Sequence, residues 1–177
     1  MIFNTRIKLN VMEEIKKVIV GLDVGKSGGI VMIYQDNSIR CHIMPMLGKE
    51  YDINELKNIL TPGPGEVFEH IGIENVHAIQ GRAGATSNFQ FGLGKGILMG
   101  LVAGLGHRYT LVNPKTWQKE AWEGVTKQAD NKQTSLIAAK RLFPGNTFLA
   151  SERSRVPHDG IVDAALIAYY CKLKFYI

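Results

Sequence analysis

The sequence predicts an α/β protein in which helices flank a mixed β-sheet. The first half of the chain carries three successive short strand-like runs separated by turn signals, as in an antiparallel meander. Two further strand-like runs, at 71–76 and 108–112, alternate with long helical segments. A length of 177 residues favours one domain with a sizeable core. We therefore expect an N-terminal extension over residues 1–17 and one domain over residues 18–177.

Composition argues against a disordered, fibrous or membrane-spanning chain. Apolar residues make up 45% of the sequence and charged residues 21%, as in ordinary globular proteins. The most apolar window, 97–106, is too short to span a bilayer, and residues 1–17 lack the apolar core of a signal peptide. Cys41 and Cys171 form no ligand-spaced pair. We therefore expect both cysteines to be free thiols in a reducing compartment. This predicts a cytoplasmic location, in the cytoplasm of the host if the gene is viral.

The charge balance favours a polyanionic partner. The formal net charge is +5 at pH 7, and the sequence pI is about 9.2. Such a balance suits binding to nucleic acid, although many basic proteins bind none.

Residues 18–34 predict a β-hairpin, because two apolar runs flank the glycine-containing turn 25–29. Asp23 ends the first run and is the anomaly in it. An ionised side chain in a buried strand is costly unless it is paired or binds a metal. Alternatively, Asp23 lies at the turn and caps its own backbone.

The next segment predicts a third strand and a short helix. Alternating apolar residues indicate a strand over 38–46, after a turn at Asp36-Asn37. Asp52, with Glu55 three residues later, is typical of a helix N-terminus, and the helix is expected to end before 61–65.

The strand-like run 71–76 carries one acid, Glu74, among apolar residues. A single acid of this kind is explained by structure. Two strands that each carry one, at Asp23 and Glu74, favour a metal or acid–base site.

A helix is expected over 88–104, with glycines at every fourth position on one face (Gly92, Gly96, Gly100 and Gly104). Each glycine costs roughly 0.5–1 kcal/mol against alanine inside a helix, so the stripe needs a compensating close contact. Either the helix lies close on its own sheet, or it meets a second copy of the chain.

After the strand at 108–112, Asn113-Pro114 predicts the cap and first turn of a helix that runs to about Trp122. Asp130-Asn131 caps a further helix over 132–143. This part of the chain is rich in basic residues, which form either a solvated helix face or a set of phosphate contacts. They are Lys115, Lys119, Lys127, Lys132, Lys140 and Arg141.

The last helix is expected over 158–170 and places Asp159 and Asp163 four residues apart on one face. Asp159 alone would be an ordinary partner of the helix dipole. Asp163 lies deeper, before an alanine-rich stretch that should pack on the sheet. Together with Asp23 and Glu74, these hard oxygen ligands suit Mg²⁺ or Mn²⁺ rather than zinc. Converging carboxylates can hold two such ions about 4 Å apart for in-line displacement at phosphodiesters.

An ordered series of short motifs resembles the RuvC-like Holliday junction resolvases, and most closely their phage and bacterial branch. The motifs are Gly21-Leu22-Asp23-Val24-Gly25, Ile73-Glu74-Asn75-Val76-His77-Ala78, Phe89-Gln90-Phe91-Gly92, Val112-Asn113-Pro114-Lys115-Thr116-Trp117, Asp130-Asn131-Lys132, Leu142-Phe143-Pro144 and His158-Asp159-Gly160-Ile161-Val162-Asp163-Ala164. No single motif is diagnostic, but their order and spacing over residues 18–174 are fairly specific. The resemblance implies a ribonuclease H-like fold with a mixed five-stranded sheet, and a homodimer that nicks two strands of a four-way DNA junction.

The resemblance also assigns roles to residues. It implies that Asp23, Glu74 and Asp163 are metal ligands and that Lys132 lies near the scissile phosphate. The family often has an acid or histidine three residues before the last aspartate, where this chain has Gly160. Asp159, which shares a helical face with Asp163, is expected to serve instead, with His158 as the alternative.

The resemblance bears on two more features. His77 falls near the position where some relatives use an aromatic residue to stack at the junction centre. Phe89 or Phe91 could substitute, but each is expected in the core. The resemblance also favours a dimer contact for the glycine stripe.

These observations lead to the hypothesis of a Mg²⁺-dependent, structure-selective endonuclease, with two ions per active site and Mn²⁺ as a possible substitute. It would resolve four-way DNA junctions in recombination and repair, leaving 5′-phosphate and 3′-hydroxyl ends. The expected DNA contacts are Lys26, Arg82, Lys115, Lys127 and Lys132. The alternatives are a nuclease of the same fold that acts on forks, flaps or other branched nucleic acid, and a non-catalytic junction-binding protein.

Overall fold

A five-stranded mixed β-sheet forms the centre of the computed structural model, which describes residues 15–75 and 84–175. The strand order is β3-β2-β1-β6-β7. The first three strands pair antiparallel, whereas β6 runs parallel to β1 and β7 runs parallel to β6. The bounds are β1 (Lys16–Asp23), β2 (Gly29–Ile33), β3 (Ile39–Ile43), β6 (Glu66–Glu74) and β7 (Tyr109–Val112). The expected sheet of a three-stranded meander and two further strands is therefore confirmed.

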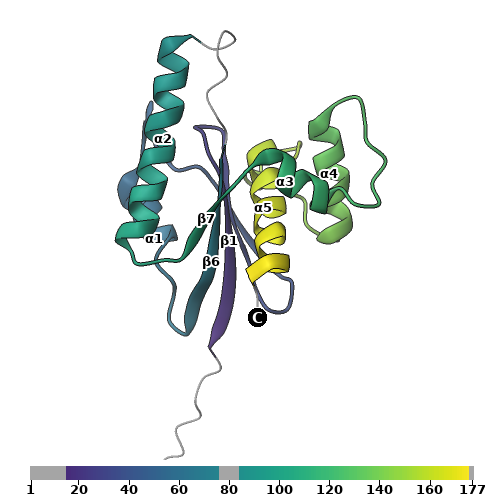
Figure 1. Ribbon diagram of the computed structural model, residues 1–177, viewed down its shortest axis with the longest axis horizontal. Coiled ribbons are helices and arrows are strands. Elements are labelled where there is room, and N and C mark those ends of the chain that lie inside the picture. The colour runs from purple at the N-terminus through teal and green to yellow at the C-terminus, as the bar shows by residue number, and fades with distance from the viewer. Residues whose placement is uncertain (1–14, 76–83, 176–177) are drawn as a thin grey trace, which may run out of the picture.

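Helices cover both faces of this sheet (Figure 1). On one side lie α1 (Ile53–Ile59) and α2 (Ala85–Gly104), and on the other lie α3 (Pro114–Ala121), α4 (Asn131–Leu142) and α5 (Asp159–Phe175). Successive residues of a strand point to opposite faces. Val18 and Val20 accordingly pack in the core under α2, while Ile19 packs in the core under α5.

Local sequence signals explain where several helices begin. The Asp52 side chain accepts a hydrogen bond from the Glu55 N–H at 3.0 Å, which caps α1 as expected. Asp130 caps α4 in the same way through the Lys132 N–H. Asn113 precedes α3 but makes no side-chain cap; its Oδ1 accepts a hydrogen bond from Asn75 instead.

The structure also contains a two-stranded hairpin that the sequence pattern does not reveal. Its strands are β4 (Met46–Leu47) and β5 (Glu50–Tyr51), which pair antiparallel. The predicted third strand, 38–46, ends earlier, since β3 stops at Ile43. Two-residue strands carry too few residues for an alternating pattern to be recognised.

The glycine stripe of α2 does not face the sheet. All four glycines are exposed, and a Cβ atom placed on any of them would meet no atom of residues 15–75 or 84–175 within 4 Å. The explanation that the stripe lies close on its own sheet is therefore wrong. A different glycine of α2, Gly94, does make a close contact: a Cβ added to it would lie 2.1 Å from the Tyr51 hydroxyl oxygen.

Helix α5 lies directly on the central strands. Gly160 packs against the turn between β1 and β2, and a Cβ placed on it would lie 2.3 Å from the Ser27 carbonyl oxygen. The same contact from the other side involves Gly29, whose added Cβ would lie 2.6 Å from the Gly160 oxygen. The start of α5 is therefore held close to the end of β1. Across the parts of the chain that the structure describes, no helix is long and apolar enough to cross a membrane.

Candidate active site

Asp23 and Glu74 lie side by side at one end of the sheet. Asp23 is the last residue of β1 and Glu74 the last residue of β6, and the register of these parallel strands pairs Leu22 with Ile73. Carboxyl ends of neighbouring parallel strands meet at the same edge of a sheet. The two acids therefore lie at adjacent strand ends, at the upper end of the sheet in Figure 1.

The two carboxyl groups interact directly. Burial raises the pKa of Asp23 well above its usual value, and the charge of Glu74 and a side-chain hydrogen bond with it raise this pKa further. Burial also raises the pKa of Glu74, although hydrogen bonds from Asp23 and Trp117 oppose the shift. Two carboxyl groups that share a hydrogen bond resist ionising together, because their negative charges repel each other.

Trp117 on α3 supplies an indole N–H to this pair. Its Nε1 donates to Oε1 of Glu74 at 3.2 Å, and both side chains are buried. Sequence reasoning placed Trp117 in a motif but gave it no role. Trp117 lies in the first turn of α3 and packs in the core. Its indole N–H thereby reaches Glu74 at the end of β6.

Asp163 joins the pair from the second turn of α5. The pKa of Asp163 is raised to about 7, mainly by burial and also by the charges of Glu74 and Asp159. A hydrogen bond from Ser135 on α4 and the charge of Lys132 act in the opposite direction. Ser135 is buried and was missed by the sequence analysis. The signal available was a polar pair, Thr134-Ser135, inside an otherwise apolar helix face.

Asp159 lies at the exposed edge of the cluster. Its charge acts on both Asp23 and Asp163, and its Oδ2 lies 2.5 Å from Lys132 Nζ. The side chains of Lys132 and Asp159 are 66% and 55% exposed, so this ion pair lies in solvent. The pKa of Lys132 is raised by that hydrogen bond and charge. We call Asp23, Glu74, Asp159 and Asp163 the acidic cluster.

The position of Gly160 explains its departure from the family pattern. A side chain at 160 would collide with the backbone of the turn at Gly28, so no acid fits there. Asp159 is one residue earlier and reaches the cluster. The His158 ring faces its own helix, because Nδ1 accepts a 3.4 Å hydrogen bond from the Ile161 N–H.

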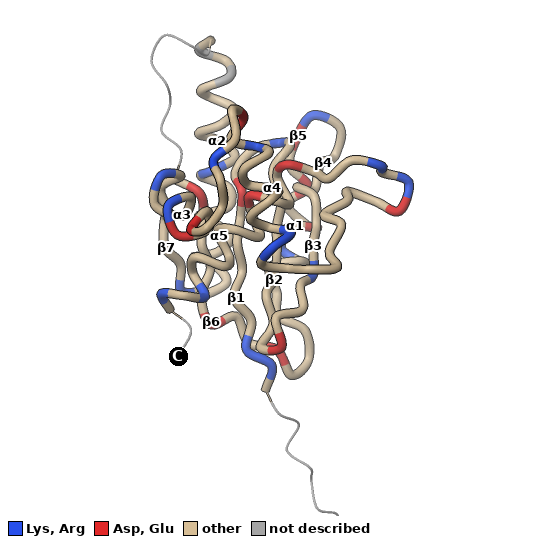
Figure 2. The backbone as a smooth tube through the Cα atoms, turned by 90° about the vertical axis from the view of Figure 1, so that its right-hand side faces the viewer, with Lys and Arg blue, Asp and Glu red and all other residues tan. Residues whose placement is uncertain are grey.

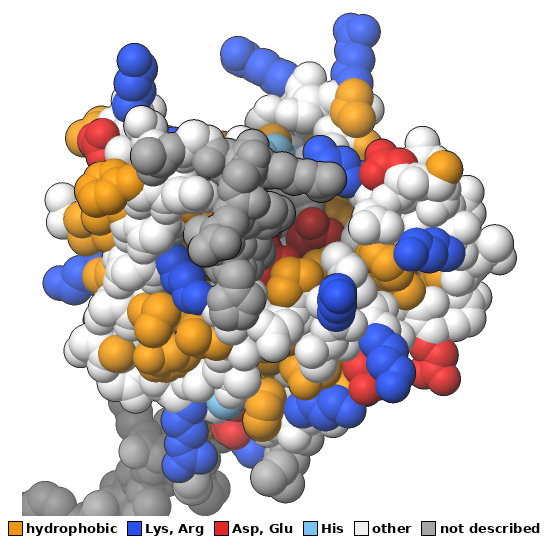
Figure 3. Space-filling view, turned by 45° about the horizontal axis from the view of Figure 1, so that its top comes forward, with side chains coloured by type: hydrophobic (Ala, Val, Ile, Leu, Met, Phe, Trp, Pro, Cys, Tyr) orange, Lys and Arg blue, Asp and Glu red, His pale blue; other side chains and the backbone are white. Residues whose placement is uncertain are grey.

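A polar network lies beside Glu74. Asn75, the first residue after β6, donates to Asn113 Oδ1 at 3.0 Å and accepts a hydrogen bond from Lys95 Nζ of α2. Sequence reasoning gave Lys95 no role, although it is a cation within the apolar stretch of α2. Figure 3 shows acidic side chains at the bottom of a hollow on this end of the molecule, with lysine and arginine side chains around it.

The expected DNA contacts are exposed where the structure describes them. Lys26, Lys115 and Lys127 are exposed, and Lys26 donates to the backbone carbonyl of Lys49. Arg82 and His77 lie outside the described residues. Figure 2 shows basic residues at both ends of the molecule, so positive charge is not confined to the end that carries the acidic cluster.

Of the two phenylalanines expected in the core, one is not there. Phe91 is half-buried and packs against the hydrophobic core under α2. Phe89 is 67% exposed, so its assignment to the core is wrong. Phe89 and Leu93 lie on neighbouring turns of α2 and both point away from the sheet core.

Comparison with solved structures identifies proteins that share this fold. The structure matches Thermus thermophilus RuvC with a TM-score of 0.51 and 14% identity, covering 89% of this chain and 97% of that chain. It matches T. thermophilus RuvC in complex with a Holliday junction substrate with a TM-score of 0.55 and 12% identity, at the same coverage. The yeast mitochondrial Holliday junction resolvase Ydc2 gives a TM-score of 0.51 and 15% identity, covering 89% and 80%.

This chain has the RuvC fold. The resemblance to RuvC-like resolvases is thus confirmed at the level of the fold, and the comparisons do not distinguish a phage or bacterial branch. No family model and no curated protein sequence matches the chain. On the RuvC fold of this chain, the acidic cluster occupies the strand ends and the start of α5.

The donor set of the acidic cluster fits a hard divalent cation in kind. All its donors are carboxylate oxygens, as Mg²⁺ and Mn²⁺ prefer. Burial raises the pKa values of Asp23, Glu74 and Asp163, and neighbouring acidic charges raise those of Asp23 and Asp163 further; a bound cation would relieve these costs. Within 15–75 and 84–175, no group of three or more His, Cys, Asp or Glu side chains is already arranged to hold a metal ion.

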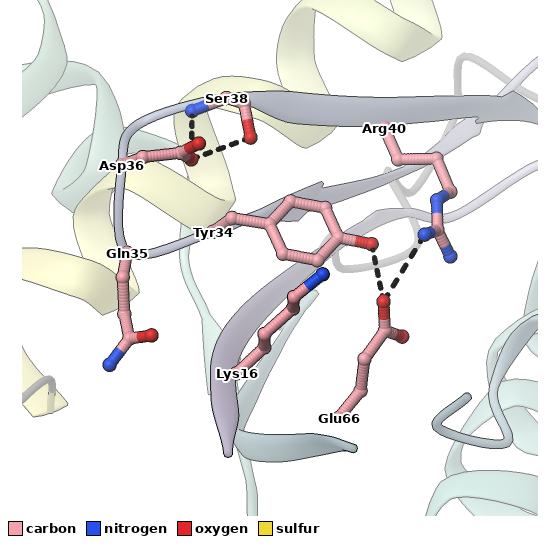
Figure 4. Close-up of a pocket in the computed structure, with 7 residues that line it drawn as sticks. All are labelled: Lys16, Tyr34, Gln35, Asp36, Ser38, Arg40 and Glu66. Carbon is pink, nitrogen blue, oxygen red and sulfur yellow. Dashed lines mark hydrogen bonds and ion pairs between the residues drawn. The ribbon is translucent and has the colours of Figure 1, made fainter. Parts of the chain in front are cut away.

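A separate pocket of about 450 Å³ lies at the opposite end of the sheet. Figure 4 shows the Tyr34 hydroxyl and the Arg40 guanidinium converging on Glu66, at 3.0 and 3.2 Å. Burial, followed by the hydrogen bond to Glu66, raises the pKa of Tyr34 to about 12. Both of these donors already bind Glu66. The polar contacts in this pocket therefore have a structural role, which is to connect the start of β6 to the end of β2.

Proposed function

We propose that this protein is a divalent-cation-dependent endonuclease that cuts four-way DNA junctions by phosphodiester hydrolysis, leaving 5′-phosphate and 3′-hydroxyl ends. The observation that carries the proposal is that Asp23, Glu74 and Asp163 lie close together at one end of the sheet in a chain with the RuvC fold, since the charges of Glu74 and Asp163 raise the pKa of Asp23 and the charge of Glu74 raises that of Asp163. Burying a single ionised carboxylate costs free energy, and burying several close together costs more because their charges repel. Such an arrangement points to a cationic ligand.

The residues of the acidic cluster would hold the cation, and their neighbours would fix the carboxylates. The Trp117 indole restrains one oxygen of Glu74, and Ser135 restrains Asp163. When bound, Mg²⁺ or Mn²⁺ would supply activation of water and charge stabilisation at the phosphate, with two ions per site as the proposed number.

The basic residues around the hollow would act on the phosphate. Lys132 Nζ is exposed beside Asp159, from where it would neutralise charge that develops on the phosphate in the transition state. Lys26, Lys115 and Lys127 would hold the DNA backbone, and we extend the same role to Arg82. Backbone contacts of this kind position DNA without reading its sequence.

We further propose that the active protein is a homodimer. Among the described residues, nothing lies within 4 Å of a Cβ placed on any of the four exposed glycines of α2, and the exposed Phe89 and Leu93 continue this surface. Two copies that meet here would let two active sites cut a junction as a pair.

The direct test is cleavage of a synthetic four-way junction in Mg²⁺ by the wild type and by Asp23→Asn and Glu74→Gln. Loss of a carboxylate that holds the cation should lower the cleavage rate roughly 100-fold or more. Asp36→Asn is a matched control, because Asp36 is an exposed acid that accepts hydrogen bonds from Ser38 at the far end of the sheet.

Near-wild-type cleavage by either active-site variant, or full cleavage in excess chelator, would contradict the proposal. A panel of forks, flaps and RNA–DNA hybrids separates a junction resolvase from a nuclease of wider range. A protein that binds junctions with or without cation and never cuts them would be a non-catalytic binding module.

A further inference from the structure

The loop between α4 and α5 is held closed at its base. The His158 N–H donates to the Phe148 carbonyl oxygen at 2.8 Å, and Leu149 pairs with Pro157 in an isolated antiparallel bridge. Phe148 is buried in the same core as α5, with a φ of 55° that residues other than glycine rarely adopt. Such a conformation persists only where the surrounding structure fixes it. Both ends of the segment 149–157, which we call the arginine loop, are therefore anchored.

This loop presents two arginines that the described part of the chain does not use. The side chains of Arg153 and Arg155 are exposed, and neither forms an ion pair or a hydrogen bond with residues 15–75 or 84–175. The one acid in the loop is the exposed Glu152, so the loop is basic on balance. A guanidinium group has five N–H donors in a planar fork that matches a phosphate group.

The arginine loop leads directly into the acidic cluster. Arg155 precedes Asp159 by four residues in the sequence. The next two residues, Val156 and Pro157, line a pocket of about 190 Å³ that is also lined by Lys132 and Asp159. That lysine and aspartate form the ion pair at the exposed edge of the acidic cluster. One continuous surface thus joins the two arginines, the pocket and the proposed site of cleavage.

The pocket suits the sugar or base of a nucleotide better than its phosphate. Leu136 and Val162 add to its apolar lining, and Val156 on the loop side is 74% exposed. The carboxylates of Asp130 and Asp159 also line it and would repel a phosphate group. Pockets for drug-sized ligands measure about 300–1,000 Å³. This pocket is smaller, and therefore has room for one sugar or base.

We propose that the arginine loop binds the DNA strand that is cut, with Arg153 and Arg155 on phosphates beside the scissile phosphate and the sugar or base of the intervening nucleotide in the pocket. The inference rests on the proposed function, because that function places a scissile phosphate at the acidic cluster. The basic loop and its continuity with the cluster favour a DNA strand as the occupant of the pocket. Phosphate contacts of this kind fix the register of a strand without reading its sequence.

The first test is the double variant Arg153→Gln with Arg155→Gln in the full-length protein. The measurement is the affinity for a synthetic four-way junction in chelator, by fluorescence anisotropy at several salt concentrations. We expect the dissociation constant to rise at least about tenfold. The slope of the logarithm of affinity against the logarithm of salt concentration should fall by about 2, because two phosphate contacts are lost. The melting temperature should not change, because neither side chain has a partner to lose.

A second double variant, Lys57→Gln with Arg108→Gln, is the matched control. It removes the same amount of charge from exposed positions, in the last turn of α1 and directly before β7. Its junction affinity should stay within about twofold of the wild type, because these charges lie far from the bound strand and are screened by salt. Equal losses of affinity in the two double variants would show an effect of net charge alone and would overturn the inference.

The second test locates the contacts on the DNA. A neutral methylphosphonate replaces one phosphate at a time around the branch point of the junction. In the wild type, replacement at one or two positions should weaken binding about tenfold, as loss of an arginine does. The same replacements should have no further effect in the arginine double variant, and the positions should flank the mapped cut. Additive losses at every position, or coupled positions remote from the cut, would overturn the inference.

These binding measurements need no cleavage, so the inference and the proposed function can fail separately. A protein that couples the two arginines to phosphates near the branch point but leaves junctions uncut in Mg²⁺ would refute the proposed activity and keep the arginine loop as a DNA contact. A protein that cuts junctions, and whose arginine double variant binds them like the wild type, would keep the activity and overturn the inference.

Discussion

The indole Nε1 of Trp117 donates a 3.2 Å hydrogen bond to Oε1 of Glu74, so that a helix on one face of the sheet holds an acid at the end of a central strand. A hydrogen bond to a buried charged group contributes about 1.5–3 kcal/mol. Trp117→Phe should therefore lower the free energy of unfolding by at least about this amount. Chemical denaturation in Mg²⁺, where the proposed cation would keep Glu74 ionised, measures it.

Trp122→Phe is the control for this prediction. The two rings contact each other edge to face, with centroids 6.3 Å apart, but the buried Trp122 Nε1 has no hydrogen-bond partner in the described part of the chain. Its replacement loses ring area without losing a hydrogen bond. Equal losses of stability in the two variants would show that the bond to Glu74 contributes nothing.

The raised pKa of Asp163, about 7, predicts how the cation-free protein responds to pH. A carboxyl group with a higher pKa in the folded protein than in the unfolded chain binds protons on folding. Its stabilising contribution is greatest at acidic pH and is lost as the pH rises through the folded pKa. In chelator, the melting temperature should therefore fall between about pH 5 and pH 8.

Asp163→Asn should make this decline smaller and should raise the melting temperature at pH 8 in chelator, because it removes a repelling buried charge. Asp36→Asn should leave the decline as in the wild type, since Asp36 is exposed and distant from the acidic cluster. Differential scanning calorimetry at a series of pH values checks both. The prediction fails if the melting temperatures of Asp163→Asn and of the wild type fall in parallel as the pH rises.

Lys132 is expected to matter for cleavage and hardly for folding. Its ion pair with Asp159 is more than half exposed on both sides, and exposed pairs contribute about 0–1 kcal/mol. Lys132→Ala should thus change the stability by less than about 1 kcal/mol while lowering the cleavage rate roughly 100-fold, by loss of charge stabilisation at the phosphate.

Lys174→Ala tests whether that effect is specific to position 132. Lys174 pairs with Glu120 at 3.2 Å at the opposite end of α5, and both side chains are partly exposed, at 42% and 34%. Its loss should leave cleavage unchanged. Similar cleavage rates for the two variants would argue against a role for Lys132 at the phosphate.

The bare glycine face of α2 predicts the oligomeric state. The wild type should sediment at twice the chain mass of 19.6 kDa. Replacing both Gly96 and Gly100 by Gln puts side chains where a second copy would approach, and these positions have open space in the single chain. The double variant should sediment at the mass of one chain and keep its helix content. A wild type of single-chain mass at the concentrations used for cleavage would refute the dimer.

Much of the fold was predictable because its signals are local. Strands with period-two patterning, the Asp52 and Asp130 caps and the Pro114 start of α3 depend on neighbouring residues only, and the structure agrees with them. Asp23 and Glu74 were also visible, since an acid interrupts each apolar run.

What the sequence pattern could not reveal depends on contacts between distant segments. Ser135, Lys95 and Tyr51 lie in ordinary surroundings along the chain, and their neighbours in space come from α5, β6 and α2. Phe89 was misassigned for a related reason, because an aromatic residue in an apolar helix does not tell which face meets the sheet. Its exposure follows from Leu98 and Val102 taking the buried face of α2.

The glycine-to-glycine seam between α5 and the β1–β2 turn has a consequence for how the protein can evolve. Gly29 and Gly160 touch through their backbones, so Asp23 and Asp163 are mounted on parts that cannot shift independently. A side chain at either glycine would collide with the backbone opposite, and would therefore push the start of α5, which carries Asp163, away from the end of β1, which carries Asp23.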